Sequence, residues 1–215
     1  MNYSTLCQAI MDWLNKDNIA SVLPYIVKFG QQDLEDKIFV SGGIRAMEYK
    51  PTNAAINAGT ATLDVPADYL GLIYMDLLDG ENRNPIELRQ DVREIIGLNY
   101  VTTETGLPRR IYRLEDKFYF DVKTDIQYTR EWSYWRRLTT LVEASPNNTN
   151  WWVANAEEAL LMSCLNKASA WVSGIPEGDK KKWEEGAKDA RERLILNHHR
   201  EMTSGATMRT EGWTL

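Results

Sequence analysis

The sequence predicts an α+β fold in which helical segments at both ends of the chain enclose a strand-rich middle. Apolar residues recur with helical spacing near both termini, and short apolar runs separated by turn residues fill the region between them. We therefore expect a helical bundle built from an N-terminal helix pair (1–43) and a C-terminal helix pair (144–202). The expected remainder is a β-rich insertion over 44–143 and an extended C-terminal arm over 203–215.

The N-terminal pair is predicted from two apolar stripes. The second helix is expected to begin at Ser21 as N-cap, with Pro24 in its first turn, where a missing N–H costs little. Gly30 weakens that helix by about 1 kcal/mol relative to Ala, so packing must hold it, and Ser41-Gly42-Gly43 ends it. The residues expected to be buried are Tyr3, Leu6, Cys7, Ile10 and Leu14 in the first helix, and Val22, Tyr25, Ile26 and Phe29 in the second.

The middle region predicts short hairpins. Turn residues at Ala58-Gly59, at Asp79-Gly80 with a loop longer than two residues, and at Glu115–Lys117 separate the expected strands. Residues 91–98 predict a short helix, and Ile126–Arg136 predicts a longer strand because large and polar residues alternate. The expected hairpin strands are 54–57 and 60–65, 72–78 and 85–88, and 110–114 and 118–122.

The C-terminal pair follows a polar loop over 144–150. Asn155, three residues before Glu158, predicts a capping box, and Ser173–Pro176 predicts a break before a last helix capped by Asp179. After Met202 the chain becomes polar. The expected apolar stripes are Leu161, Cys164, Leu165, Ala168, Trp171 and Val172, and then Trp183, Ala187, Ala190, Leu194 and His198.

Composition indicates a soluble globular chain that contacts other chains. Hydrophobic residues make up 43% and charged residues 26%, as is usual for a globular protein. The chain has eight Trp and ten Tyr, residue types that are common in protein cores and interfaces, which indicates contacts with other chains. The net charge of −6 argues against a surface built to hold nucleic-acid phosphates, although an acidic wall lets DNA slide past. We expect no signal peptide, because the N-terminus has no basic region and Asp12 and Asn15 interrupt its apolar run. We expect no membrane span, because no run reaches about 20 apolar residues.

The residue types that most often form catalytic or metal-binding sites are expected to have structural roles in this chain. His198 and His199 are the only histidines, and neighbours on a helix point about 100° apart, so we expect them to complement the dipole in a final turn. Cys7 and Cys164 lie on apolar faces and are expected to be buried thiols. We expect no enzyme, no cofactor and no metal site. The plentiful carboxylates, which we assign to turns, caps or exposed faces, include Asp64, Asp68, Asp76, Asp79, Glu157 and Glu158.

Two surface features have competing interpretations. The long strand places arginines between aromatic residues, which could stack on bases or sugars. We favour a packed strand face or a protein interface, in which arginine stems cover the rings. The run Lys180-Lys181-Lys182 is expected to be a solvated face. The strand residues expected on one face are Tyr128, Arg130, Trp132, Tyr134 and Arg136.

The C-terminal arm, residues 203–215, is the segment for which the sequence makes the most specific prediction of partner binding. It is polar and contains glycine, yet Met208 and Trp213 are apolar anchors that could offset the entropy of ordering on a partner. A frayed terminus explains the same composition, and both interpretations stay open. The predicted partner-binding residues are Met208, Arg209, Trp213 and Leu215.

The chain resembles the head-to-tail adaptor (connector or neck) proteins of tailed bacteriophages. The resemblance covers most of the chain, and the order and spacing of several segments carry it. These segments are Val65-Pro66-Ala67-Asp68-Tyr69-Leu70, then Gly106-Leu107-Pro108, then Tyr134-Trp135 leading to Leu138, and finally Thr149-Asn150-Trp151-Trp152 ahead of Ala159-Leu160-Leu161.

The resemblance implies a structural virion protein of the neck or tail, made in the host cytoplasm. The expected partners are the portal protein, an adjacent tail or nozzle protein, and copies of the chain in a ring of twelve. Double-stranded DNA would pass through the ring without sequence-specific binding, and no membrane is involved. One alternative is another neck, stopper or tail-completion protein. A second, from a different class, is an aromatic-lined module that binds nucleic acid or glycan, or a hydrolase acting on such a ligand.

Overall fold

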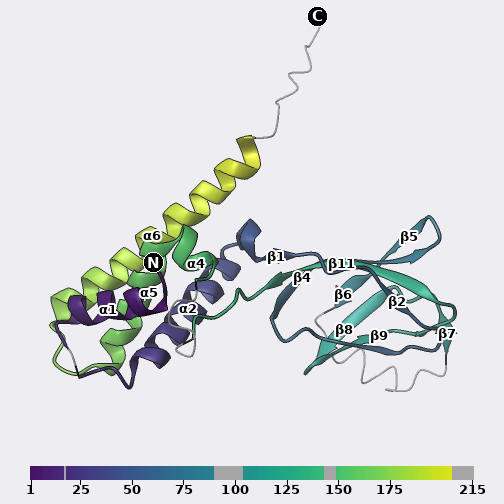
Figure 1. Ribbon diagram of the computed structural model, residues 1–215. Coiled ribbons are helices and arrows are strands. Elements are labelled where there is room, and N and C mark those ends of the chain that lie inside the picture. Colours follow the sequence, from purple (N-terminus) through teal and green to yellow (C-terminus); the bar gives the residue numbers. More distant parts are fainter. Residues whose placement is uncertain (17, 90–103, 143–148, 205–215) are drawn as a thin grey trace, which may run out of the picture. The chain divides into compact units, whose positions relative to one another are not determined.

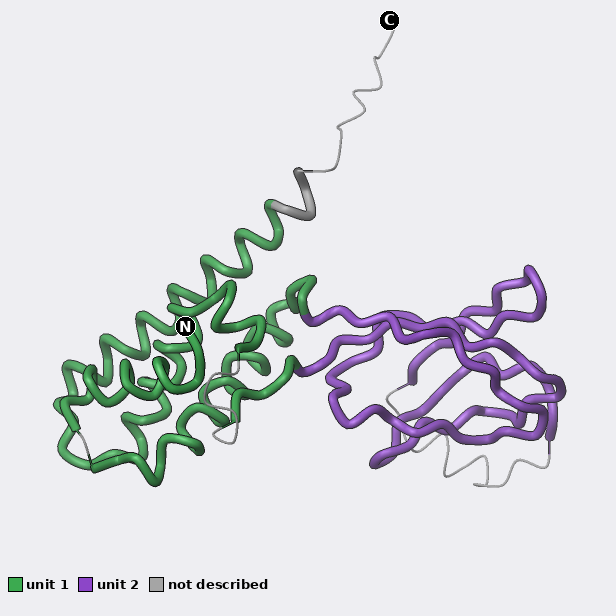
Figure 2. Tube along the Cα trace, viewed as in Figure 1, with its two compact units in different colours: residues 1–46, 138–215 green, residues 47–137 purple. Residues whose placement is uncertain are grey.

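The computed structural model describes residues 1–16, 18–89, 104–142 and 149–204, and it contains both helices and β-sheets (Figure 1). The predicted mixture of α and β structure is confirmed. The chain divides into two compact units (Figure 2): unit 1 comprises Met1–Ala46 and Leu138–Leu215, and unit 2 comprises Met47–Arg137. The finer division of the chain at residues 43, 143 and 202 stays a prediction.

Unit 1 is helical, and α5 packs against α1, α2, α4 and α6. α1 buries the five residues that the sequence predicted, and a capping box between Asn2 and Thr5 starts it. Asn15 ends it in the left-handed conformation, with φ of 49°. The helices of the described residues are α1 (Tyr3–Leu14), α2 (Leu23–Val40), α4 (Trp151–Asn155), α5 (Glu157–Trp171) and α6 (Glu177–Ser204), with a 3-10 turn, η1 (Arg45–Met47).

The predicted N-cap of α2 is wrong, although Pro24 lies in the first turn as expected. Of the four residues predicted to be buried, only Ile26 is buried. α2 begins at Leu23 after Val22, and no side chain caps it. Tyr25 and Phe29 are exposed. The helix is rotated because α5 packs directly against Gly30, where an added Cβ would lie 2.7 Å from Cys164 Sγ. The buried face is therefore Leu23, Ile26, Val27, Gly30, Gln31, Leu34, Glu35 and Ile38.

The predicted cap of the C-terminal helices is also wrong. Asn155 is the last residue of α4, and α5 follows Ala156 with no side-chain cap. The helix with a side-chain cap is α4, where Asn150 accepts a hydrogen bond from Val153 N at 3.1 Å. Trp171, expected in the buried stripe of α5, is half exposed. Asp179 lies within the first turn of α6. In α6 the burial of Trp183, Ala187 and Ala190 confirms the predicted stripe.

Unit 2 contains three sheets in the described residues. One has the order β1-β11-β4-β5, with β2 also paired to β11, and another has the order β3-β9-β8-β6; β7 and β10 pair by themselves. The strands are β1 (Glu48–Tyr49), β2 (Ala54–Ile56), β3 (Thr62–Asp64), β4 (Tyr69–Asp79), β5 (Asn82–Pro85), β6 (Glu87–Arg89), β7 (Thr105–Gly106), β8 (Arg110–Leu114), β9 (Lys117–Phe120), β10 (Lys123–Thr124) and β11 (Tyr128–Arg136).

The predicted hairpin of 110–114 and 118–122 is present. The hairpin that begins with 72–78 is also present, but its second strand is β5 and not the predicted 85–88; β6 pairs in parallel with β8 in the other sheet. β4 pairs with β5 and β8 pairs with β9, both antiparallel. The β4–β5 loop is two residues long, shorter than predicted, because Asp79 pairs with Asn82 and Gly80 takes a positive φ of 58°. The predicted hairpin around Ala58-Gly59 is wrong: β2 pairs with β11, and β3 pairs with β9. The predicted helix at 91–98 lies outside the described residues.

The core of unit 2 lies between its two larger sheets, each of which contributes buried side chains. Met75, Leu77 and Trp132 come from one sheet, and Ile111 and Phe118 from the other. Partly buried Leu63, Val65, Leu72, Leu88 and Leu107 pack against this cluster. Unit 2 therefore has a hydrophobic core of its own.

Candidate functional site

A buried polar cluster in unit 1 holds the segment that returns from unit 2. Glu35 of α2 is 1% exposed, and its Oε1 accepts from Trp152 Nε1 at 2.9 Å, from Gln31 Nε2 at 3.0 Å and from Leu138 N at 3.3 Å. Gln31 Oε1 accepts from Asn150 Nδ2 at 3.1 Å. Buried carboxylates are costly unless hydrogen-bonded, so this cluster fixes residues 138–141 and α4 onto α2.

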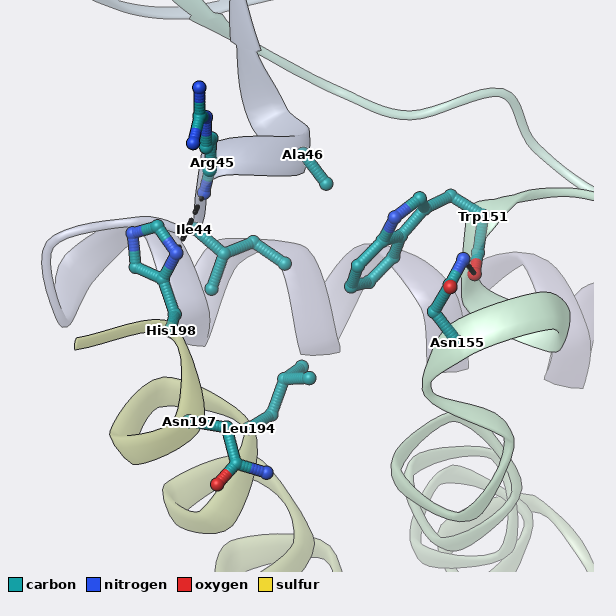
Figure 3. A pocket seen from close by; sticks show the side chains of 8 residues that line it. All are labelled: Ile44, Arg45, Ala46, Trp151, Asn155, Leu194, Asn197 and His198. Atoms are coloured by element: carbon teal, nitrogen blue, oxygen red, sulfur yellow. Dashed lines mark hydrogen bonds between the residues drawn. The ribbon is translucent and has the colours of Figure 1, made fainter. Parts of the chain in front are cut away.

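A pocket of about 430 Å³ lies beside this cluster, between η1, α4 and the second half of α6 (Figure 3). Ile44, Trp151 and Leu194 supply its apolar lining, and Arg45 stands at its edge. Arg45 N donates to His198 Nδ1 at 3.3 Å, which fastens α6 to the start of η1. The full lining is Ile44, Arg45, Ala46, Trp151, Asn155, Leu194, Asn197 and His198.

Unit 1 also carries an exposed aromatic patch, formed by Tyr25, Phe29 and Trp171. The ring of Trp171 lies 6.4 Å from that of Tyr25 and 5.2 Å from that of Phe29, measured between centroids. A shallow groove of about 320 Å³ adjoins the patch. It contains Asp33, whose pKa burial alone would raise; hydrogen bonds from Lys167 and Lys37 outweigh that effect and lower it.

The aromatic residues of β11 are core residues. Trp132 is 2% exposed and Tyr134 3% exposed, and Arg130 lies over the Trp132 ring at 4.5 Å. Arg136 lies over the ring of Tyr49 at 4.3 Å. The favoured interpretation, a packed face covered by arginine stems, is confirmed. The strand is not regular, however, because its register shifts between Ser133 and Tyr134 and again between Trp135 and Arg136.

Two tyrosines of β11 have raised pKa values. Burial, with a hydrogen bond to Asp125, raises the pKa of Tyr128 to about 12. Burial, with a hydrogen bond to Asp68, raises the pKa of Tyr134 to about 12. Both phenols therefore stay neutral in the folded protein near pH 7, and they donate to carboxylates at 2.6 Å and 3.0 Å.

The opposite face of β11 carries an ionic network that the sequence analysis missed. Glu131 accepts from Lys50 and from Arg83, the latter at 2.8 Å, and Arg83 also reaches Asp76 at 3.3 Å. The hydrogen bond from Lys50 is the main reason that the pKa of Glu131 is lowered. Lys50 and Arg83 are 81 and 48 residues from Glu131 in the sequence, so no local pattern reveals their pairing with it. The network ties β5 and the segment after β1 to the central strand.

The remaining polar candidates have structural roles. His198 and His199 do not lie in a final turn as predicted, because α6 continues to Ser204. Cys7 and Cys164 are buried free thiols, as predicted, and burial raises the pKa of Cys164. The lysines at 180–182 form a solvated face, pairing at 3.0–3.9 Å with Glu177, Asp179 and Glu185.

The carboxylates named from the sequence are partly explained by ion pairs. Asp64 pairs with Lys117 at 3.4 Å and Glu158 with Arg193 at 2.7 Å. Within the described part of the chain, no three His, Cys, Asp or Glu side chains gather as a metal site would require. In the same residues, no helix is long and apolar enough to span a bilayer. The predicted partner-binding residues Met208, Arg209, Trp213 and Leu215 lie outside the described residues.

These observations define a two-unit α+β protein in which the polar clusters fasten one segment of the chain to another. Residues 1–210 match the family model described as "SU10 adaptor protein", and the chain belongs to that family of phage head-to-tail adaptors. No curated protein matches the chain by sequence. Membership in a structural adaptor family identifies a component of the phage neck that interacts with portal and tail proteins, and it indicates a non-enzymatic role.

Proposed function

We propose that this protein is a head-to-tail adaptor that binds below the portal ring and connects it to the tail, forming part of the DNA channel. The observation that carries the proposal is the family match across residues 1–210, which includes both structural units. Adaptors act by shape and contact, and that role requires neither a cofactor nor a metal.

Particular features of the chain support this role. Unit 1 presents an exposed aromatic patch and a pocket, the kinds of surface that bind other proteins. The net charge of −6 suits a channel that double-stranded DNA traverses without sequence-specific binding. The proposed assembly is a ring of twelve copies between portal and an adjacent tail or nozzle protein, in the virion neck.

The C-terminal arm is the proposed portal contact. α6 ends at Ser204, and the residues beyond it include Met208, Arg209, Trp213 and Leu215. A large aromatic and an arginine are the residue types that most often dominate binding energy at interfaces. The arm would bind the portal after unit 1 has folded.

Co-sedimentation with the portal protein encoded nearby in the same genome tests the function. The full chain is expected to pellet with portal rings and to add a collar visible by negative-stain imaging. Portal rings that pellet intact without the adaptor would contradict the proposal. Binding to a tail ring in preference to portal would instead identify the second candidate, a tail-side neck or tail-completion protein.

A truncation after Ser204 tests the arm. It keeps α6 complete, so the helical circular dichroism and the unfolding midpoint should match those of the full chain, whereas portal binding should be lost. A chain carrying only Trp213→Ala is the matched control for the anchor. Full portal binding by the truncated chain would rule out the arm as the contact.

The alternative of an aromatic-lined ligand-binding module loses its structural basis. That alternative required the rings of β11 to stack on bases or sugars. Trp132 and Tyr134 are almost fully buried in the core of unit 2, and Arg130 covers the ring of Trp132.

A further inference from the structure

The pocket between η1, α4 and α6 has hydrogen-bond donors at its margin that are not used within the described part of the chain. Arg45 is exposed, and no ion pair among the described residues involves its guanidinium. The side-chain amide of Asn197 likewise has no hydrogen bond to any described residue. Of the described residues that line the pocket, none has a carboxylate. A ligand for this pocket would therefore bring a negative charge to these donors.

The interior of the pocket is apolar. The side chains of Ile44, Trp151 and Leu194 converge on it from separate segments of unit 1 (Figure 3). Its volume of about 430 Å³ lies within the range of pockets that bury small ligands, and it is sufficient for a large aromatic side chain. A ring in this space could pack on the indole of Trp151. The pocket therefore fits a segment in which an aromatic side chain lies close to an anionic one.

The helix that lines the pocket leads directly into the C-terminal arm. Leu194 and His198 of α6 line the pocket, and Ser204, where α6 ends, is about 9 Å beyond His198 along the helix axis. Gly205 comes next, and glycine after a helix end is the residue type that most readily lets the chain reverse its direction. The chain between Ser204 and Trp213 can span up to about 30 Å when extended, so Trp213 can return to the pocket.

The arm contains the pair of side chains that the pocket fits. Trp213 is the aromatic residue of 205–215, and Glu211 lies two residues before it, or about 7 Å along an extended chain. With the indole of Trp213 between the apolar walls, Glu211 would lie at the margin of the pocket, where Arg45 offers its guanidinium. Arg209 is twice as far from Trp213 in the sequence, which keeps its positive charge away from Arg45.

We propose that in the free subunit the C-terminal arm folds back along α6 and docks into this pocket, with Trp213 between the apolar walls and Glu211 beside Arg45. The arm then has two competing sites, the pocket of its own chain and the portal. The second of these rests on the proposed function, whereas the first is a property of the free chain. The pocket would hold the arm until portal competes for it.

Tethering makes a weak contact sufficient for this role. A short flexible connection gives the arm an effective concentration on the order of 1 mM at the pocket. A contact with an intrinsic dissociation constant of about 0.3 mM would then be formed about three-quarters of the time. Because the arm would be free for only about a quarter of the time, its apparent affinity for portal would be about fourfold lower than that of an arm that never docks.

Intramolecular cross-linking without portal tests the contact directly. The native Cys7 and Cys164 are buried, so they give little background. A double variant, Asn197→Cys with Thr214→Cys, places one thiol at the pocket and one on the arm. The matched control is Leu196→Cys with Thr214→Cys. Leu196 is exposed and does not line the pocket, and it lies at nearly the same height on α6 but about 100° around the helix from Asn197.

The two pairs differ only if the arm is docked. A short bismaleimide is expected to close the pocket pair into a loop at least about threefold faster than the control pair, because an undocked arm reaches both positions alike. Each rate is divided by the reactivity of the thiols, measured on single variants with a monofunctional maleimide. Equal closure rates would overturn the inference. Cross-linked dimers whose yield rises with protein concentration would also overturn it, because they would place the arm on another copy.

Charge reversal gives a second readout that leaves the apolar walls intact. In the cross-linkable background, Arg45→Glu and Glu211→Arg should each slow loop closure about two- to threefold, the size expected for an exposed ion pair. Combining the two changes should restore the rate. Arg209→Glu is the matched control on the arm and should not slow closure. A combined variant that closes as slowly as the single variants would overturn the proposed contact.

Adding portal rings separates this contact from the adaptor function. Portal is expected to slow closure of the pocket pair, because it competes for the arm. Faster closure of the pocket pair in a free chain that does not pellet with portal would support the docked arm and count against the portal role. Pelleting with portal, combined with equal closure rates for the pocket and control pairs, would overturn the docked arm and leave the adaptor function standing.

Discussion

Replacing Gly30 with alanine tests a close contact between α2 and α5. An added Cβ at this position would lie 2.7 Å from Cys164 Sγ and 2.8 Å from Cys164 Cα. The first atom belongs to a short buried side chain, and the second is backbone of α5. Relief therefore requires α5 to move relative to α2, which is also held by the hydrogen bond from Trp152 Nε1 to Glu35.

The expected magnitude combines two opposing effects. Alanine stabilises a helix interior by about 1 kcal/mol relative to glycine. Overpacking a well-packed contact costs typically about 1–3 kcal/mol, and a clash with backbone belongs at the upper end of that range. The net expectation for Gly30→Ala is a loss of about 1–2 kcal/mol in the free energy of unfolding, which corresponds to a few degrees in Tm for a chain of this size.

Urea unfolding followed by helical circular dichroism measures this change in unit 1. Gly178→Ala in α6 is the matched control, because nothing lies within 4 Å of its added Cβ; it should stabilise by at most about 1 kcal/mol. Cys164→Ala in the Gly30→Ala background removes the Sγ clash but not the Cα clash, so it should restore little. Equal stabilisation by Gly30→Ala and Gly178→Ala would refute the close contact.

Three further predictions concern buried and charged groups. Glu35→Ala leaves buried hydrogen-bond donors without an acceptor and should lower the free energy of unfolding, measured with urea, by on the order of 3 kcal/mol. Glu35→Gln keeps an acceptor and should cost clearly less. Equal losses for the two variants would contradict the role of these hydrogen bonds. Because the folded-state pKa of Asp33 is lowered, its contribution to the free energy of unfolding is present above pH 3.8 and is lost as the pH falls below it. The stability of Asp33→Asn should therefore depend less on pH in the acid range than that of the native chain. An unchanged pH profile would argue against the pairing of Asp33 with lysine. Burial and hydrogen bonds raise the pKa values of Tyr128 and Tyr134 to about 12, so their contribution to the free energy of unfolding is present below pH 10 and is lost between pH 10 and 12. In a titration followed by phenolate absorbance, both should ionise after the exposed tyrosines. Early ionisation would contradict their burial.

Local patterns predicted the elements that depend on local forces. The buried face of α1 follows the helical period with no competing stripe, and its five buried residues were all predicted. The hairpin between β8 and β9 was predicted from its turn residues, of which Glu115 takes a positive φ of 53°. The turn between β8 and β9 is set within a few residues, and the buried face of α1 follows from its own period even though its packing partner, α5, is distant in the sequence.

The errors arise where distant segments decide the outcome. Two stripes of α2 satisfy helical spacing, and the sequence alone favoured the one with Tyr25 and Phe29. The other stripe is the buried one because Gly30 allows α5 to approach closely and because Glu35 accepts hydrogen bonds from two distant residues, Leu138 and Trp152, as well as from Gln31 in the same helix. Counting apolar residues on a helix face cannot predict that a carboxylate is buried there, because the cost of burying it is offset by hydrogen-bond partners about 100 residues away.

The strands show the same limit. Turn residues identified β2 and β3 as strands but suggested the wrong pairing, since a local turn signal does not exclude more distant partners, and the two strands pair with β11 and β9. The sequence favoured a packed face or a protein interface for the aromatic residues of β11 over a ligand platform, and the burial of Trp132 shows a core. Assigning these rings to packing shifts the search for binding surfaces to unit 1. There the misassigned residues Tyr25, Phe29 and Trp171, predicted to be buried, are the ones left exposed together. Their helical spacing reflects an apolar face that this unit does not cover with its own described residues, which is what an interface with another chain requires.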